Sequence, residues 1–333
     1  MGACAQKQQP CFTFGVIADV QFADRPDSFS RWNAMRYYRQ SCLHLRNAID
    51  EWNKEDIPAS FVFQLGDIID GSNRRLRKSQ QALEIILKEF ERLKAPVHHV
   101  LGNHELDNFD RQYLWESALN TIWMSDKTHD GPSMRGVENT DCASYYAYSF
   151  SPYPNFRCVV VDSYDLSFYR QDESNPKYQE TTAFLERNQN AEPGDAKKRV
   201  KLPLMEFNGG FSRSQLSWLD EVLTFSDKRK ERVIVAGHNP IHPRAALVTC
   251  LAWNALEMLD LLHSHPSVVC YIAGHDHNGG YHEDSRGIHH VTMEGVIESP
   301  AGTNAFATAC AYDDRLILQG RGRVQSRVLR YRK

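Results

Sequence analysis

Long hydrophobic runs, paired cysteines and an excess of basic residues are all missing from this chain. No stretch of 18 consecutive apolar residues occurs, so the sequence predicts no membrane-spanning helix, and the residues before Pro10 contain no apolar run typical of a secretory signal. The eight cysteines include no C-x-x-C pair, and Cys158 and Cys270 lie in apolar runs where reduced thiols commonly pack. We therefore expect a cytoplasmic protein in a reducing compartment.

The charge balance excludes a further class of function. The formal net charge is −3, so the chain lacks the broad basic surface that attracts nucleic acid or an anionic membrane. The hydrophobic fraction of 41% is ordinary for a globular protein with a sizeable core. We expect a folded monomer whose partners are small molecules, with no role in binding nucleic acid or membrane.

Six short apolar runs have the length and the β-branched or aromatic content of strands, and three segments between them have helical periodicity. The predicted strands are 12–18, 60–65, 97–101, 157–161, 233–236 and 268–273, and the predicted helices are 38–52, 79–93 and 214–223, the last capped by Ser212 or Ser214. Strands that alternate with helices indicate an α/β fold in which helices cover the faces of a sheet.

The domain prediction is a flexible N-terminal tail at 1–11 and a single domain over 12–333. Two polar stretches, near 125–141 and 166–203, interrupt the alternation of strands and helices. Each is interpreted as an insertion over the surface. The sequence leaves open whether the longer, structureless one is functional or disordered.

Side chains that bind divalent metals follow five of the predicted strands. They are Asp19 and Gln21, Asp67, Asn103 with His104, His238, and His275 with His277. Ligands of open α/β sheets bind outside the carboxyl ends of strands, so these positions are where a site is expected. Each motif alone has a structural explanation, such as a helix cap for a single Asp, but their joint occurrence in one order favours a two-metal hydrolytic site.

This order of motifs resembles the calcineurin-like metallophosphoesterases, whose pattern is D-x-H, G-D, G-N-H-[ED], a lone His and G-H-x-H. The match extends from Phe12 to about Gly295. The resemblance implies a layered sandwich of two mixed β-sheets flanked by helices. It also implies two cations bridged by Asp67, one bound by Asp19, Gln21, Asp67 and His277 and the other by Asp67, Asn103, His238 and His275.

Gln21 stands where that family usually has His. One interpretation is a lost ligand and a weakened site. In the other, an amide oxygen replaces an imidazole nitrogen, which gives the first site three oxygen donors and one nitrogen. Oxygen donors suit Mn²⁺ or Mg²⁺ better than Zn²⁺. We therefore expect two divalent cations, with Mn²⁺ preferred and Mg²⁺ possible.

The resemblance also implies the catalytic roles. His104 would face the leaving group as an acid or stabilise the charged transition state, while the two cations activate a water for in-line attack. Asp70 would orient the His104 imidazole. An equal interpretation makes Asp70 a turn residue before Gly71.

Further motifs narrow the substrate. FGVIADVQFAD, QLGDIIDG, FNGGFS, CLAWN, AGHDHNGGY and EGVIE resemble a manganese-dependent branch of the family that acts on nucleoside diphosphate derivatives. The implied reaction hydrolyses the phosphoanhydride bond of ADP-ribose, CDP-choline, CDP-ethanolamine or CDP-glycerol, giving AMP or CMP plus a phosphorylated sugar or alcohol. The alternatives are a phosphodiesterase for cyclic nucleotides or headgroups, and a non-catalytic scaffold that binds a partner protein.

Substrate contacts are predicted less directly. Phe29, in an aromatic cluster with Phe22 and Trp32, could stack a base. Asn208 and Gly209, followed by Gly210, form a turn that could present backbone amides to a phosphate or ribose. Cys250 could line the pocket or be a core thiol. Arg36 and Arg39 could touch a phosphate, but their place on a predicted helix face favours solvated side chains.

Overall fold

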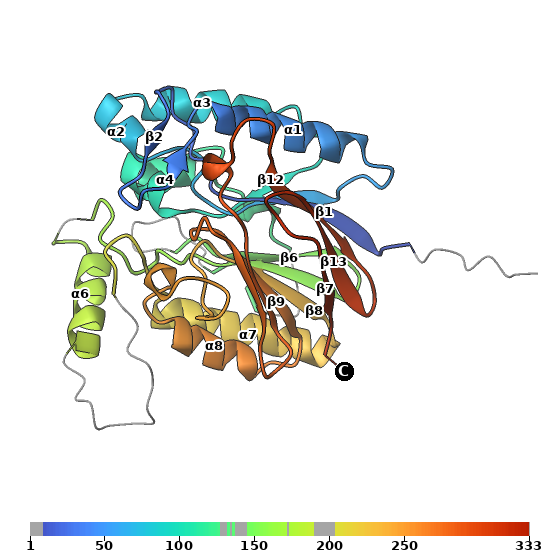
Figure 1. Cartoon of the computed structure of the whole chain (residues 1–333). Coiled ribbons are helices and arrows are strands. Elements are labelled where there is room, and N and C mark those ends of the chain that lie inside the picture. Colours follow the sequence, from blue (N-terminus) through green and yellow to red (C-terminus); the bar gives the residue numbers. More distant parts are fainter. Residues whose placement is uncertain are drawn as a thin grey trace, which may run out of the picture.

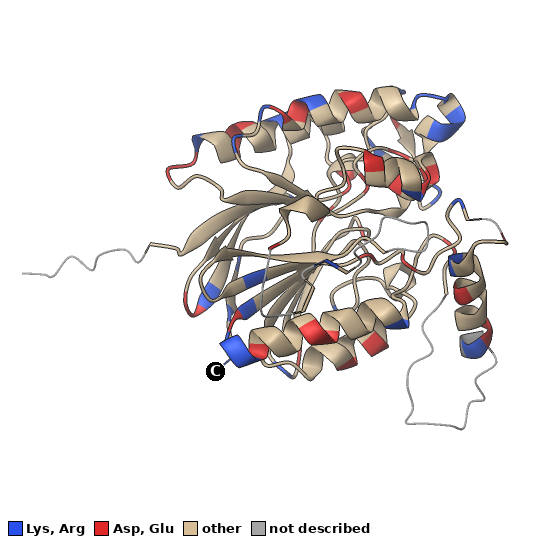
Figure 2. Ribbon diagram, turned by 180° about the vertical axis from the view of Figure 1, so that it is seen from behind, with Lys and Arg blue, Asp and Glu red and all other residues tan. Residues whose placement is uncertain are grey.

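The computed structural model describes residues 9–126, 132–133, 135–136, 145–171, 173–189 and 204–332. Two six-stranded mixed sheets lie face to face, and helices cover their outer faces (Figure 1). Acidic and basic residues both occur along these outer helices (Figure 2). The layered α/β sandwich expected from the sequence is therefore confirmed.

The first sheet has the order β14-β13-β12-β1-β4-β5. Its strands are β1 (Phe12–Ile17), β4 (Phe61–Gln64), β5 (Val97–His99), β12 (Ala305–Ala311), β13 (Arg315–Gly322) and β14 (Arg327–Arg330). β1, β4 and β5 are parallel, and helices α1 (Gln40–Lys54) and α3 (Ser79–Phe90) connect them. Parallel strands need such crossovers, so the carboxyl ends of all three strands meet at one edge.

The second sheet has the order β10-β11-β9-β8-β7-β6. Its strands are β6 (Tyr148–Tyr153), β7 (Phe156–Val160), β8 (Arg232–Ala236), β9 (Val268–Ala273), β10 (Gly280–Glu283) and β11 (His289–Thr292). The four inner strands are parallel, and helices α7 (Arg213–Arg229) and α8 (Ala255–His263) pack on their outer face. β6 and β10 pair antiparallel at the two edges.

Short elements complete the chain and carry much of the site. Strands β2 (Ser28–Phe29) and β3 (Met35–Arg36) form a separate ribbon. The remaining helices are α2 (Ser72–Leu76), α4 (Asn103–Asn108), α5 (Arg111–Glu116), α6 (Pro176–Gln189), and the 3-10 turns η1 (Ile122–Met124), η2 (Val248–Cys250) and η3 (Val296–Glu298).

Aromatic side chains join the inner faces of the two sheets. The ring centroids of Phe12 and Phe156 are 5.1 Å apart, and those of Phe61 and Phe150 are 5.2 Å apart, each pair edge to face. Such pairs stabilise a core beyond the area that they bury. This shared core fixes the strand ends of both sheets relative to each other.

All six predicted strands and three predicted helices are present, with ends shifted by a few residues. Ser212 caps α7 by accepting a hydrogen bond from the Gln215 amide. The polar stretch 166–203 is not structureless throughout, because α6 occupies Pro176–Gln189 within it, and Leu166 is buried. Residues 190–203 and most of 125–141 lie outside the described part of the chain.

The predicted tail is too long at its inner end. The Cys11 amide donates to the Ala311 carbonyl at 2.7 Å, so Cys11 extends the β1 ladder. Residues 1–8 lie outside the described part. All six cysteines within that part are unpaired thiols. None of its helices is long and apolar enough to cross a membrane.

Candidate metal centre

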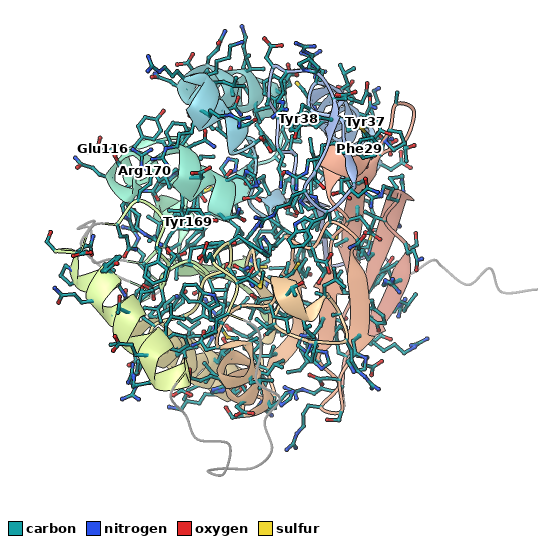
Figure 3. All side chains as sticks on the ribbon, turned by 60° about the vertical axis from the view of Figure 1, so that its left-hand side comes forward. Phe29, Tyr37, Tyr38, Glu116, Tyr169 and Arg170 are labelled. Carbon is teal, nitrogen blue, oxygen red and sulfur yellow. The ribbon has the colours of Figure 1, made fainter. Side chains whose placement is uncertain are left out.

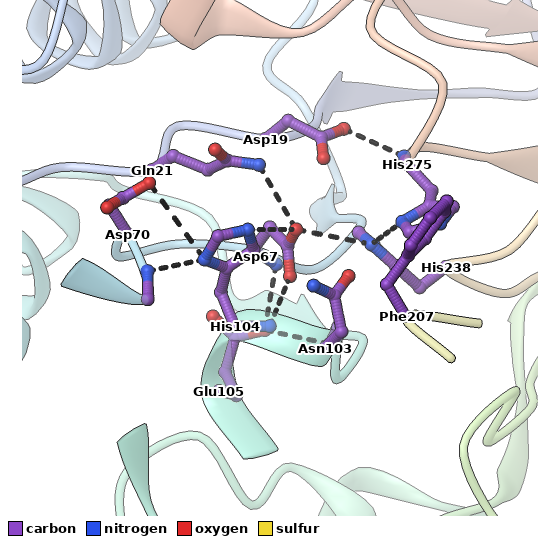
Figure 4. A network of polar contacts seen from close by, with 12 residues as sticks. Asp19, Gln21, Asp67, Asp70, Asn103, His104, Glu105, Phe207, His238 and His275 are labelled. Atoms are coloured by element: carbon purple, nitrogen blue, oxygen red, sulfur yellow. Dashed lines mark hydrogen bonds and ion pairs between the residues drawn. The ribbon is translucent and has the colours of Figure 1, made fainter. Parts of the chain in front are cut away.

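The loops after β1, β4, β5, β8 and β9 bring the seven predicted metal ligands together at one edge of the sandwich. These residues, here called the metal-site cluster, are Asp19, Gln21, Asp67, Asn103, His238, His275 and His277. Asp67 occupies the centre of the cluster (Figure 4). The carboxylates of Asp19 and Asp67 and the His238 imidazole are almost completely buried. Buried charge of this kind requires a partner.

The backbone of the site is strained at four ligand positions. Asp19, Gln21, Asp67 and His275 have φ values of 54°, 44°, 55° and 70°. This left-handed region costs a residue with a Cβ about 1–2 kcal/mol. Such conformations cluster at functional sites, where the surrounding structure holds them in place.

Glu105 ties two of the ligand loops together. Its carboxylate accepts hydrogen bonds from the amides of Asp67 at 2.8 Å, Ile68 at 2.6 Å and Gly102 at 2.7 Å. A Cβ at Gly102 would overlap the Asp67 carboxylate, so the loops approach more closely than other residues allow. The E of the G-N-H-E motif therefore fixes where Asp67 and Asn103 stand.

One half of the cluster consists of Asp19, Gln21 and His277. His277 Nε2 lies 3.3 Å from Asp19 Oδ1 and 2.9 Å from Gln21 Nε2. Asp19 Oδ2 accepts from the His275 amide, but the buried Asp19 Oδ1 accepts no hydrogen bond. A buried carboxylate oxygen without a donor is the kind of atom that a cation satisfies.

The other half is centred on Asp67, His238 and His275. One ligand atom from each of these three residues lies within 4.8 Å of the other two. Asp67 Oδ2 is 3.5 Å from His238 Nε2, which is 3.1 Å from His275 Nδ1. Tyr164 reaches the fourth predicted ligand, since its hydroxyl lies 3.1 Å from Asn103 Oδ1.

Each histidine of the cluster has a partner for the ring nitrogen that faces away. His277 Nδ1 bonds Glu298 Oε1 at 2.9 Å, His238 Nδ1 bonds the Leu65 carbonyl at 2.6 Å, and His275 Nε2 bonds Asn208 Oδ1 at 2.8 Å. In the neutral ring, which is the form that binds a metal, such contacts place the proton on the outer nitrogen and leave the inner one free. They also hold the ring orientation.

The electrostatics differ among the three rings. Burial alone would lower the pKa of His238, but the Asp67 carboxylate more than offsets this and raises it to about 9. Asp19 raises the pKa of His277 to about 9 in the same way. Burial and the neighbouring His238 hold the pKa of His275 well below its usual range. The Asp67 pKa is lowered, mainly by His104 and His238 against the opposing effect of burial.

Gln21 is held in an orientation that the sequence does not reveal. Its Oε1 accepts a hydrogen bond from Arg36 Nη1 at 3.0 Å, and its Nε2 donates to Asp67 Oδ2 at 3.1 Å. An amide nitrogen is not a metal ligand, so coordination would require the amide to present its oxygen inward instead. The role of Gln21 as a ligand stays a prediction.

His104 is fixed by the backbone rather than by Asp70. Its Nδ1 accepts a short hydrogen bond from the Gly71 amide, while Asp70 Oδ2 lies 3.9 Å away. Asp70 Oδ1 accepts from the Ser72 amide at 2.8 Å, which matches the turn interpretation. Because Nδ1 is an acceptor, the neutral ring carries its proton on Nε2, 3.6 Å from Asp67 Oδ2.

The predicted substrate residues lie in several places. Phe29 is 62% exposed. It lies near Tyr37 and Tyr38 in Figure 3, away from Tyr169 and Arg170. Trp32 lies against Phe207, with ring centroids 6.4 Å apart. Their contact with a substrate stays a prediction.

Asn208, Gly209 and Cys250 have contacts within the protein. Asn208 is buried, and its amide nitrogen donates to the carbonyls of Thr249 and Leu251 while its oxygen faces His275. The Gly209 carbonyl accepts from the Trp253 amide. Burial raises the pKa of the Cys250 thiol to about 12. Asn208 therefore orients a predicted ligand in this structure, and a substrate contact remains a prediction for all three.

Glu298 and Phe207 contact the metal-site cluster but were not named from sequence, and Arg36 was named only as a phosphate contact. The interpretation of Arg36 as a solvated helix residue is wrong, because it lies in β3 before α1 begins, and its side chain is 18% exposed. Arg39 does pair with Asp24 at the surface. The EGVIE motif was the available signal for Glu298, and FNGGFS for Phe207.

A second group of histidines surrounds Asp284, and we call it the outer histidine cluster. His263 Nε2 and His290 Nε2 lie 2.9 and 2.8 Å from Asp284 Oδ2. The His242 ring lies 4.5 Å from that of His282 and 4.7 Å from that of His290. Burial and these imidazoles lower the pKa of His242 to about 4.

Comparisons with known proteins agree with the geometry. The family model described as calcineurin-like phosphoesterase matches residues 12–279. Mouse manganese-dependent ADP-ribose/CDP-alcohol diphosphatase is 46% identical over 99% of this chain and 96% of its own length, and the Arabidopsis thaliana protein of the same name is 37% identical over 98% of both. A dimetal phosphatase from Danio rerio superposes with a TM-score of 0.85 at 44% identity, covering 97% of this chain and 100% of the other.

Proposed function

Because the chain belongs to the calcineurin-like phosphoesterase family, we propose that it is a manganese-dependent hydrolase of the phosphoanhydride bond in ADP-ribose and CDP-alcohols. The products are AMP or CMP and a phosphorylated sugar or alcohol. The observation that carries this proposal is 46% identity, over nearly the whole of both chains, to proteins named for that activity. The metal-site cluster offers the ligands that a manganese-dependent hydrolysis requires.

The residues present fit two divalent cations that share Asp67. Asp19 offers a buried oxygen without a donor, and Asp67, His238 and His275 converge within 4.8 Å. Carboxylate and amide oxygens alongside imidazoles suit manganese. We assign Asp19, Gln21, Asp67 and His277 to one cation and Asp67, Asn103, His238 and His275 to the other. When bound, such a pair polarises a phosphoryl oxygen and lowers the pKa of a water to give the nucleophile.

His104 has the geometry of a hydrogen-bond donor to the leaving group. The Gly71 amide occupies Nδ1, so the Nε2 proton points toward the cluster at Asp67. The His104 amide also donates to Asp67 Oδ1 at 2.8 Å, which fixes the ring beside the centre where the phosphorus must lie. A hydrogen bond from Nε2 to the departing oxygen would strengthen as its negative charge develops.

The test is turnover of ADP-ribose, CDP-choline and a 2′,3′-cyclic nucleotide by metal-free protein titrated with Mn²⁺, Mg²⁺ and Zn²⁺. We expect Mn²⁺ to restore the highest rate of AMP and CMP release, because the oxygen-rich half of the cluster favours harder cations. Preference for the cyclic nucleotide, with no AMP from ADP-ribose, would overturn the proposal. Equal rates with and without chelator would exclude a metal-dependent reaction.

We further propose that the chain acts as a cytoplasmic monomer on small molecules alone. Its net charge of −3 and the unpaired thiols of its described cysteines support this. Light scattering during size-exclusion chromatography should give a mass near 38.2 kDa. A mass of twice that value would contradict the monomer.

A further inference from the structure

One cation near the metal-site cluster lies over two aromatic rings. Arg31 lies in the connection between β2 and β3, and its guanidinium carbon is 4.9 Å from the ring centroid of Trp32 and 5.1 Å from that of Phe207. A guanidinium stacks well on aromatic faces because it is planar and weakly hydrated. The two rings thus hold the charge in place and leave the edge of the guanidinium free to donate.

A short chain of contacts links this guanidinium to the predicted ligands. The Phe207 ring centroid lies 5.7 Å from that of His275, and Phe207 stands beside His275 and His238 in Figure 4. The Phe207 carbonyl accepts from the Tyr164 hydroxyl, which also reaches Asn103. Arg31 is therefore within two ring contacts of the metal-site cluster.

The arginine and lysine side chains that follow Arg31 between residues 36 and 78 and are named next have partners within the protein. Arg36 bonds Gln21 and lies 3.5 Å from Asp70, Arg39 and Lys78 pair with Asp24, and Arg74 pairs with Asp107. Arg31 has no carboxylate within ion-pair distance among the residues that the structure describes. Its charge is thus available to a ligand.

We propose that Arg31 binds the phosphate that the metal-site cluster does not hold, and so selects diphosphates over esters of a single phosphate. This inference rests on the proposed function. A phosphoanhydride carries two adjacent charged phosphates, and the predicted metal ligands surround only the one under attack. The guanidinium fork offers two parallel N–H groups to the oxygens of the second. Because Trp32 and Phe207 restrict the side chain beforehand, little conformational entropy is lost on binding.

The experiment compares Arg31→Ala and Arg31→Lys with the wild type on two substrates in the presence of saturating Mn²⁺. ADP-ribose has two phosphates, and bis(p-nitrophenyl) phosphate has one. We expect Arg31→Ala to raise KM for ADP-ribose by about 10-fold or more, with less than a threefold change for the single-phosphate diester. Arg31→Lys should recover only part of the loss, since an ammonium lacks the planar fork.

A control and a second readout keep the outcomes distinct. Arg213→Ala removes an exposed arginine at the start of α7 and should leave both reactions unchanged. Inorganic pyrophosphate should inhibit diester hydrolysis by the wild type about 10-fold more strongly than it inhibits Arg31→Ala. An equal loss on both substrates, or unchanged pyrophosphate inhibition, would overturn the role of Arg31. If the wild type cleaves the diester but releases no AMP from ADP-ribose, the proposed function fails, while pyrophosphate inhibition still tests Arg31.

Discussion

Two histidines only four residues apart, His238 and His242, have pKa values that are shifted in opposite directions. In the metal-site cluster, carboxylates raise the pKa of His238 to about 9 despite its burial. In the outer histidine cluster, burial and neighbouring imidazoles lower the pKa of His242 to about 4. The neighbours of each histidine therefore decide whether its imidazole favours the protonated or the neutral form.

The carboxylates of the two clusters also differ in their hydrogen-bond partners. Asp284 Oδ2 contacts His263 and His290, and its Oδ1 accepts from the amides of Arg286 and Ile288, so every acceptor has a donor. In the metal-site cluster, Asp19 Oδ1 is buried and accepts no hydrogen bond, with the His277 ring nitrogen 3.3 Å away. Buried polar atoms in native proteins are normally satisfied. A group of histidines thus indicates a metal site when a neighbouring buried carboxylate has an oxygen atom that accepts no hydrogen bond.

The strongest way to break the comparison is to remove the central carboxylate of each cluster. Asp67→Ala should lower kcat/KM for ADP-ribose by about three orders of magnitude or more, because both cations are proposed to share that residue. Asp284→Asn should leave activity per folded molecule within about twofold while lowering the free energy of unfolding by about 1–3 kcal/mol. Steady-state kinetics and urea denaturation measure the two effects. A comparable loss of activity in both variants would show that the clusters act together.

A smaller effect is expected from the hydrogen-bond partners of the rings. Glu298→Gln weakens the acceptor for His277 Nδ1 and should raise the Mn²⁺ concentration for half-maximal activity by about 10–100-fold. Glu294→Gln, four residues earlier and half-buried, is the matched control and should leave that concentration unchanged. The measurement is activity against free Mn²⁺. Equal behaviour of the two variants would remove Glu298 from the site.

The smallest effect concerns pH. The folded-state pKa of His242 is about 4, below its ordinary value of 6.5, so the unfolded chain binds more protons between these values and acid destabilises the fold. The other titratable groups that act on the His242 imidazole are His263, His282, His290 and Asp284. His242→Phe should therefore lose less stability than the wild type between pH 7 and 4.5, by about 1 kcal/mol after allowance for solvent screening. Parallel stability curves for the two proteins would contradict the assignment.

The sequence predicted the fold where strands are apolar and parallel, because a buried strand is a continuous hydrophobic run. It did not predict β13, whose exposed positions carry polar residues such as Gln319, or β12, which is fully buried but rich in alanine. Helix α6 was missed because its surface is largely polar and its contacts are few.

The site divides in the same way. Residues adjacent to strand ends, such as Asp67 and His275, were found because topology alone brings strand ends together. Arg36 in β3 and Arg31 in the preceding loop owe their positions to tertiary packing, so no spacing in the sequence identifies them. The orientation of the Gln21 amide depends on Arg36 and was out of reach for the same reason.

The left-handed turns at Asp19, Gln21, Asp67 and His275 have a consequence for any effort to engineer this protein. Glycine adopts that geometry without steric cost, so evolution toward a more robust fold would replace these side chains first. Selection for catalysis opposes that drift at each of the four positions. Thermal stability and turnover therefore compete at these positions. Engineering for thermal stability should leave these four residues unchanged.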